Sequence, residues 1–124
     1  SALVVTRALS AAGWQVDTVQ TAEDAIDRAA THPYQAILTD IHLPGASGDE
    51  VLAAIRAARG PNALAPIIAV TADVSPERRL ACEQAGFTTI IEKPIRPRAL
   101  VASLVDILLA DRAAAAEAGH RQTA

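Results

Sequence analysis

The sequence lacks several features that mark specialised classes of protein. Cys82 is its only cysteine, which excludes an internal disulfide and a zinc site built from clustered cysteines. No apolar run approaches the roughly 20 residues of a membrane-spanning helix. The N-terminus also lacks the charged and then apolar pattern of a signal peptide. These absences predict a cytoplasmic location.

Positive charge is sparse and scattered. The eleven basic residues form no block or stripe, and the formal net charge is −3. Direct binding to nucleic acid and contact with a membrane by this segment are therefore not expected. Ten of the basic residues are arginine, and Lys93 is the only lysine. The expected partner is another protein, and the single lysine becomes a candidate functional residue.

The composition is that of one globular domain, with 124 residues of which 51% are hydrophobic and 20% charged. Segments typical of strands alternate with segments typical of helices. The expected helices cover residues 1–12, 21–33, 48–60, 75–86 and 97–110, and the expected strands cover residues 15–19, 36–39, 66–71 and 88–92. This alternation predicts an α/β fold with a parallel sheet between two layers of helices.

Two helical segments leave alternatives open. Residues 1–12 have apolar residues at helical spacing, but the β-branched residues of Leu3-Val4-Val5 also suit a strand; we favour the helix. In the helix at 97–110, Val105 and Leu109 widen the apolar stripe. That width fits either a helix packed more deeply or a contact between the subunits of a homodimer.

The alanine-rich end of the chain has no periodic apolar face. We therefore predict one domain over residues 1–110 and a helical extension or tail over residues 111–124.

Three of the predicted strands end in side chains that suit phosphoryl chemistry. Asp40, Thr71 and Lys93 each lie at the end of a different strand, and the carboxyl ends of parallel strands share one edge of the sheet. Each residue alone has an ordinary structural explanation. Together they favour a site, because a carboxylate can accept a phosphoryl group whose oxygens a lysine and a hydroxyl stabilise. The small Ala72 leaves room for a phosphate.

The chain resembles the receiver domains of two-component response regulators and hybrid histidine kinases. The resemblance covers about residues 1–110. Its most specific parts are ILTDIHLPG at residues 37–45 with Gly48, PIIAVTA at residues 66–72, and the stretch from Gly86-Phe87 to EKPI at residues 92–95. It implies a doubly wound parallel sheet with the flavodoxin-like strand order 2-1-3-4-5. The sequence of residues 66–85 is most similar to the sequences of receivers attached to hybrid histidine kinases.

The resemblance also implies a role for each site residue. Asp40 would be the phosphoacceptor, Lys93 would pair with the phosphoryl group or the carboxylate, and Thr71 would be the switch hydroxyl. A Mg²⁺ ion would be bound by Asp40 and the backbone carbonyl of His42. The partner would be a histidine kinase or a histidine phosphotransfer domain.

The sequence departs from the family at two points. Ile90 stands where the family usually has an aromatic switch residue. Receivers also begin with a strand that ends in a pair of acidic residues that hold the magnesium ion, whereas residues 1–12 match the helix after it, so this strand and its acids are missing from residues 1–124. We expect either a longer chain or a rearrangement in which Leu3-Val4-Val5, or an element of a second chain, fills the gap.

The function predicted from these residues is phosphoryl transfer to Asp40 within a phosphorelay, which switches a protein-interaction surface. Such a domain is a signalling module rather than an enzyme, although it assists its own phosphorylation and dephosphorylation. The alternative is a pseudo-receiver that acts as a docking or dimerisation module without phosphate. An aspartate-nucleophile phosphatase is disfavoured, because His42 stands where its second aspartate would be.

Overall fold

The computed structural model describes residues 2–43 and 45–123. Within these ranges the order along the chain is two helices, three strands, and then helix, strand, helix, strand and helix. The helices are α1 (Ala2–Ala11), α2 (Ala22–Thr31), α3 (Gly48–Ala57), α4 (Pro76–Ala85) and α5 (Pro97–Thr123). The strands are β1 (Ile37–Asp40), β2 (His42–Leu43), β3 (Ala46–Ser47), β4 (Ile67–Thr71) and β5 (Thr89–Glu92).

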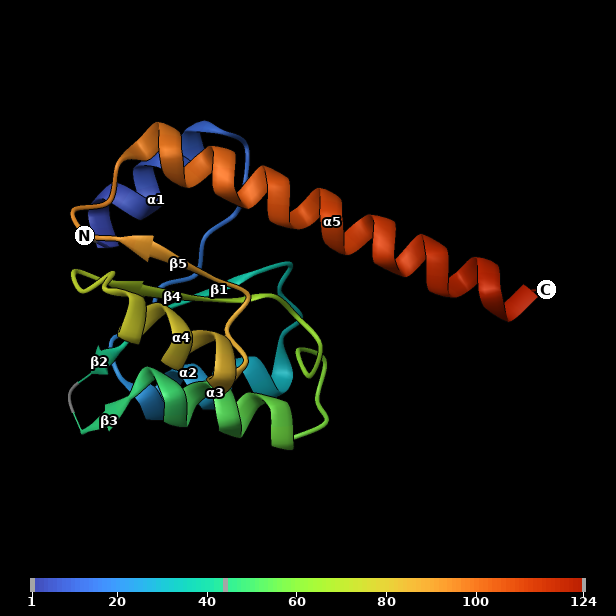
Figure 1. Ribbon diagram of the computed structural model, residues 1–124, viewed down its shortest axis with the longest axis horizontal. Coiled ribbons are helices and arrows are strands. Elements are labelled where there is room, and N and C mark those ends of the chain that lie inside the picture. Colours follow the sequence, from blue (N-terminus) through green and yellow to red (C-terminus); the bar gives the residue numbers. More distant parts are fainter. Residues whose placement is uncertain (1, 44, 124) are drawn as a thin grey trace.

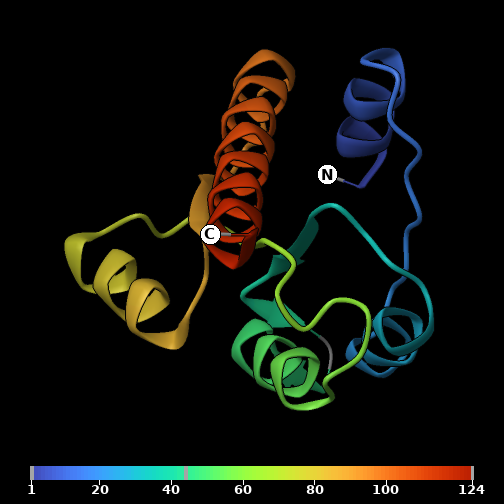
Figure 2. The same ribbon diagram turned by 90° about the vertical axis from the view of Figure 1, so that its right-hand side faces the viewer.

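Three strands form a parallel sheet in the order β1-β4-β5. Helices α1 and α5 cover one face of this sheet, and α2, α3 and α4 cover the other (Figures 1 and 2). The central strand β4 is buried along its whole length. Its residues Ile67 and Ala69 join the core beneath α2, α3 and α4, whereas Ile68 and Val70 join the core beneath α1 and α5. This arrangement confirms the predicted α/β fold.

Short polar residues begin the helices that lead away from the sheet. Thr21, Ser47 and Ser75 each accept a hydrogen bond from a backbone N–H in the first turn of α2, α3 and α4 respectively, which satisfies a donor that the helix itself leaves unpaired. Helix α4 ends at Gly86, whose φ of 107° lies in the left-handed region. These helix boundaries follow from local sequence signals.

The segment before α2 differs from its prediction. Residues 15–19 were expected to form a strand, but residues 14–19 lie in no strand and run without turns toward α2 (Figure 2). Among the described residues, β1 pairs only with β4. A strand needs a neighbour that accepts its backbone hydrogen bonds, and no described strand lies between this segment and β1. The strand prediction for residues 15–19 is therefore wrong.

The alternative strand at Leu3-Val4-Val5 is also wrong, because these residues lie within α1. At the other end of the chain, α5 continues as one helix to Thr123 and extends beyond the sheet (Figure 1). Leu109 is 59% exposed and Val105 is 39% exposed, so deep packing does not account for the wide apolar stripe. No helix within residues 2–43 and 45–123 is long and apolar enough to span a bilayer.

Candidate functional site

Asp40 and Lys93 meet at the carboxyl edge of the sheet. Asp40 is the last residue of β1, and Lys93 follows the last residue of β5. The Lys93 ammonium nitrogen lies 2.8 Å from Asp40 Oδ1, and both side chains are 36% exposed. The backbone N–H of Lys93 donates to the carbonyl of Thr71 at 2.9 Å, which extends the pairing of β5 with β4. The sheet thus holds an accessible carboxylate against one ammonium group.

Thr71 ends β4, the strand between the other two. Its side chain is buried, and its hydroxyl oxygen accepts a hydrogen bond from the backbone N–H of Asp73 at 3.1 Å. This bond uses an oxygen lone pair, so the hydroxyl hydrogen can still be donated to an anion. Ala72 is exposed beside it. The three strand ends therefore bring together the carboxylate, hydroxyl and ammonium groups that the sequence singled out.

The loop after Thr71 is braced by a network that the sequence reasoning missed. Asp73 accepts a hydrogen bond from the Ser75 backbone N–H at 3.0 Å, and its other oxygen lies 3.6 Å from Arg78 Nε. The hydrogen bonds from Ser75, together with the positive charge of Arg78, lower the pKa of Asp73. The sequence does signal that a helix begins at Ser75-Pro76. It does not show which residues contact Asp73, because those contacts depend on the path of the folded loop.

Gly48 holds the loop after β1 close to Asp40. The Gly48 N–H donates to the carbonyl of Ile41 at 2.7 Å. A Cβ atom at position 48 would lie 2.6 Å from the backbone oxygen of Asp40, which is closer than a Cβ atom can come to another heavy atom without a shift of the structure. Glycine is required here by this close contact with the backbone. Ser47 then caps α3 by accepting from the Glu50 N–H at 3.2 Å.

Two other predicted residues lie beside the site. His42 lies in β2 with its side chain exposed, and it pairs with Ser47 of β3. Ile90 lies half-buried in β5 opposite Ala69 and packs against the core cluster beneath α2, α3 and α4. An aliphatic side chain in this position has no aromatic ring to rotate between exposed and buried states.

The described residues fit a magnesium ion only in part. Asp40 supplies a carboxylate, which is a preferred ligand of this cation. However, no group of three or more His, Cys, Asp and Glu side chains suited to a metal ion is found in residues 2–43 and 45–123. A magnesium site at Asp40 would need further oxygen ligands, from backbone carbonyls, from water or from outside these residues.

The model of the response regulator receiver domain family matches residues 2–105. The sensory/regulatory protein RpfC of Xanthomonas campestris pv. campestris (strain 8004) is 34% identical over 123 residues, which are 98% of this chain and 17% of that protein. Hybrid signal transduction histidine kinase L of Dictyostelium discoideum is 35% identical over 98 residues, which are 75% of this chain and 6% of that protein. The chain thus spans a small part of these relatives.

Solved structures show the same architecture. Chemotaxis protein CheY4 of Vibrio cholerae superposes with a TM-score of 0.78 at 27% identity, over 84% of this chain and 86% of that one. The receiver domain of sensor histidine kinase PA1611 from Pseudomonas aeruginosa PAO1, which has a magnesium ion coordinated in its active-site cleft, gives a TM-score of 0.77 at 31% identity, over 86% of this chain and 87% of that one. These likenesses confirm the flavodoxin-like fold. The chain belongs to the response regulator receiver domain family of two-component signalling proteins.

Proposed function

We propose that this receiver domain accepts a phosphoryl group on Asp40 from a phosphohistidine of a histidine kinase or a histidine phosphotransfer domain. The observation that carries this proposal is the pairing of Lys93 with Asp40 at 2.8 Å, beside the buried hydroxyl of Thr71. A nucleophile and two groups that can stabilise phosphoryl oxygens thus lie at the ends of three adjacent strands. Two relatives with matching segments are named histidine kinases or sensory regulators, which supports such a partner.

The transfer needs little rearrangement of Asp40. Lys93 holds Oδ1, so the other carboxylate oxygen attacks phosphorus. A phosphorus–oxygen bond forms while the phosphorus–nitrogen bond breaks, and the electron pair stays on the imidazole nitrogen, which then takes a proton. The Lys93 ammonium stabilises the negative charge that collects on the phosphoryl oxygens.

The product changes the electrostatics around Thr71. An ordinary protein phosphate carries a charge of about −1.5 to −2 near neutral pH, and the Thr71 hydroxyl hydrogen is a suitable donor to it. The Asp73 backbone N–H donates a hydrogen bond to the Thr71 hydroxyl. Movement of Thr71 therefore shifts Asp73 and the loop that leads into α4. Because Ile90 is aliphatic, the signal passes through the backbone and helices near β5 rather than through a rotating ring.

Magnesium belongs to the proposal as the cofactor, with the Asp40 carboxylate and the His42 backbone carbonyl as ligands. The magnesium ion named in the PA1611 receiver structure supports it. The metal would supply further positive charge at the phosphoryl oxygens. No step above depends on it, because the part of the chain that the structure describes has no group of three or more His, Cys, Asp and Glu side chains suited to a metal ion. The domain acts on no separate substrate in this proposal, and it assists only its own phosphorylation and dephosphorylation.

A pseudo-receiver that docks or dimerises without phosphate is the second candidate. It is favoured by the aliphatic residue at position 90 and by the exposed apolar Leu109, 59% accessible on α5, which suits a contact with a second copy. In this function the Asp40–Lys93 pair would be structural.

Incubation with acetyl phosphate and Mg²⁺, followed by intact-mass measurement, separates the two functions. We expect the mass of one phosphoryl group to be added to the wild type and to the Asp106→Asn control, whose substitution lies on α5 away from the site. The Asp40→Asn variant should gain nothing. Unmodified wild type under conditions that label another receiver would reject the phosphorylated switch and favour the pseudo-receiver.

A further inference from the structure

A groove lies at the opposite end of the sheet from Asp40. It has a volume of about 420 Å³ and is lined by one face of α5, by the loop between α3 and β4, and by Arg56 of α3. Pro66 and Thr88 also line it and come just before β4 and β5, so the groove opens at the amino ends of these strands. We propose that it binds an amphipathic helix of a partner protein, with an apolar stripe flanked by lysine or arginine.

Hydrogen bonds hold the loop between α3 and β4 in place. Asn62 is buried, and its amide nitrogen donates to the carbonyls of Ala29 at 2.7 Å and His32 at 2.6 Å. Its amide oxygen accepts from the backbone N–H of Tyr34 at 2.7 Å. These bonds tie the loop to α2 and to the residues just before β1.

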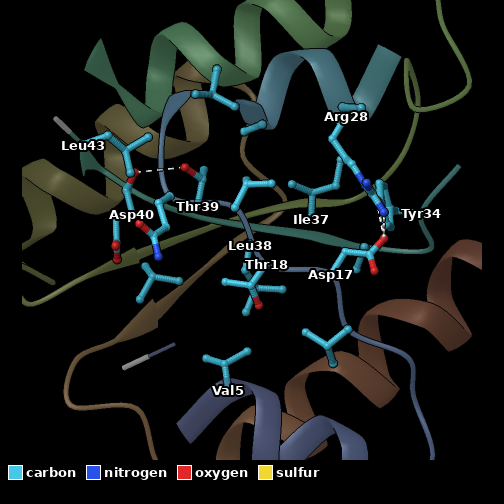
Figure 3. Close-up of a pocket in the computed structure, with 18 of the residues that line it drawn as sticks. Val5, Asp17, Thr18, Arg28, Tyr34, Ile37, Leu38, Thr39, Asp40 and Leu43 are labelled. Atoms are coloured by element: carbon cyan, nitrogen blue, oxygen red, sulfur yellow. Dashed lines mark hydrogen bonds and ion pairs between the residues drawn. The ribbon is translucent and has the colours of Figure 1, made fainter. Parts of the chain in front are cut away.

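Tyr34 is fixed in turn by its side chain. The Tyr34 hydroxyl donates to Asp17 Oδ2 at 2.6 Å. Arg28 donates to the same oxygen at 3.1 Å and to the Tyr34 hydroxyl at 2.9 Å (Figure 3). The contact between Tyr34 and Asn62 therefore belongs to a longer network, which makes the loop a preformed element of the surface.

Leu64 is an exposed apolar side chain on this preformed loop. The Arg56 guanidinium also braces the loop, by donating to the carbonyls of Asn62 at 3.3 Å and Ala63 at 2.8 Å. Leu64 follows directly and is 90% exposed. A single exposed leucine is ordinary, but this one lines a groove and its backbone is already ordered. Binding through such a residue costs little further conformational entropy, so Leu64 is a suitable anchor for a partner.

One face of α5 forms the other wall of the groove. Its lining residues share this face because they are spaced by three and four positions: Ile107, Ala110, Asp111 and Ala114. Helix α5 projects beyond the sheet at the end where the loop with Leu64 lies (Figures 1 and 2). The small alanine side chains let a second helix approach closely. A helix laid along this face would cover Ile107 and Leu64 together.

The form of the occupant follows from this wall. Because α5 pairs its own backbone groups along its length, it has none to offer to an extended segment. A bound helix satisfies its own backbone and needs only side-chain contacts. Helices that dock in this way present apolar residues at spacings of three, four and seven.

Asp106 and Asp111 determine the charge of the occupant. Both line the groove and are exposed. Neither takes part in an ion pair of the described part of the chain, and the basic residue of the lining, Arg56, is engaged with loop carbonyls. Lysine or arginine beside the apolar stripe of a partner would complement these two carboxylates.

The same charges disfavour a second copy of this chain as the occupant. A two-fold symmetric contact places the same patch on both sides of the interface. Such a contact would bring Asp106 and Asp111 of two copies together, and like charges in an interface oppose binding. The geometry and charge of the groove are thus those expected for a different protein.

A synthetic peptide tests the proposal. The probe has about 18 residues, or five helical turns, with leucine at helical spacing, lysine on both flanks, alanine elsewhere and a fluorescent label. We expect saturable binding by fluorescence anisotropy and changes in the amide chemical shifts of Leu64 and Ile107. A shuffled peptide without the stripe, and one with glutamate in place of lysine, should each bind at least about tenfold more weakly. Equal binding of either control, or unchanged shifts at both amides, would overturn the proposal.

A pair of leucine substitutions locates the binding. Leu64→Ser removes the anchor and should weaken peptide binding by about tenfold or more. The core stays intact, because this side chain is exposed. Leu80→Ser, on α4 outside the groove and 54% exposed, should leave the affinity unchanged. Equal affinities of the two variants would contradict the assignment.

A pair of double variants tests the charge of the groove. Asp106→Asn combined with Asp111→Asn should weaken binding and make it less sensitive to salt. Asp27→Asn combined with Asp49→Asn, at exposed positions outside the groove, should bind the peptide as the wild type does. The same salt dependence in both double variants would refute the complementary charge. A Leu64 amide shift that changes with protein concentration in the absence of peptide would also overturn the proposal, since it would assign the groove to a second copy.

Discussion

The ammonium group of Lys93 lies 2.8 Å from the carboxylate of Asp40. Asp40 ends one outer strand of the three-stranded sheet, and Lys93 follows the end of the other. Both side chains are about one third exposed, so this ion pair adds little to stability, typically below about 1 kcal/mol. Its importance is to place a positive charge at the oxygen that would receive a phosphate. A substitution that breaks this ion pair should therefore affect phosphorylation much more than the free energy of unfolding.

Substitution of Lys93 by methionine should slow phosphorylation strongly while the protein stays folded. Loss of one group that stabilises developing charge typically costs about 10²-fold or more in rate. Initial rates of labelling by acetyl phosphate measure this effect, and urea unfolding measures stability. Arg98→Met, at an exposed position in the first turn of α5, is the control. A Lys93→Met rate within twofold of the control would refute the assigned role.

Removal of the Thr71 hydroxyl should uncouple phosphorylation from the loop before α4. In Thr71→Val the Asp73 N–H loses its acceptor, and we expect a loss of about 1 kcal/mol in the free energy of unfolding. Chemical shifts of the Asp73 and Val74 amides should then respond little to beryllium fluoride. Thr71→Ser keeps the hydroxyl and should keep the response. Equal responses in the two variants would exclude a switching role for this group.

Gly48→Ala should destabilise the protein, because the added Cβ would lie 2.6 Å from the Asp40 backbone oxygen. Forcing such a contact apart typically costs about 1–3 kcal/mol. Gly60→Ala is the matched control, since its Cβ would meet the nearest atom at an ordinary 3.5 Å. Urea denaturation compares the two variants. Similar unfolding midpoints would show that the loop after β1 adapts without cost.

Tyr34 is the only tyrosine of the chain, so its titration can be followed by phenolate absorbance alone. Burial, and then the hydrogen bond to Asp17, raise its pKa above the ordinary value of 10.0. The folded protein therefore keeps the phenol proton at a pH where the unfolded chain loses it. This contribution to stability is complete below the unfolded pKa and is lost as pH rises through the folded pKa.

Asp17→Ala provides the comparison for Tyr34. It removes the hydrogen bond that raises the Tyr34 pKa, so its phenolate should form at lower pH than in the wild type. Asp24→Ala, exposed on α2, should leave the titration unchanged. An identical Tyr34 titration in Asp17→Ala and the wild type would contradict the hydrogen bond between the Tyr34 hydroxyl and Asp17.

Much of the fold was predictable because its signals are local. Thr21, Ser47 and Ser75 cap the helices that they precede, and the apolar run at β4 is buried on both faces as expected. The placement of Asp40, Thr71 and Lys93 at one edge followed from the rule that parallel strands end together. Their roles in phosphoryl transfer remain predictions.

The sequence by itself determined which segments become helices, which apolar runs enter the sheet and which polar residues end those strands, because these depend on neighbours along the chain. Only the tertiary structure decided that residues 15–19 stay unpaired and that Asp17 meets Tyr34 and Arg28. A strand exists only where a second backbone satisfies its hydrogen bonds, and periodicity within one segment carries no information about that partner.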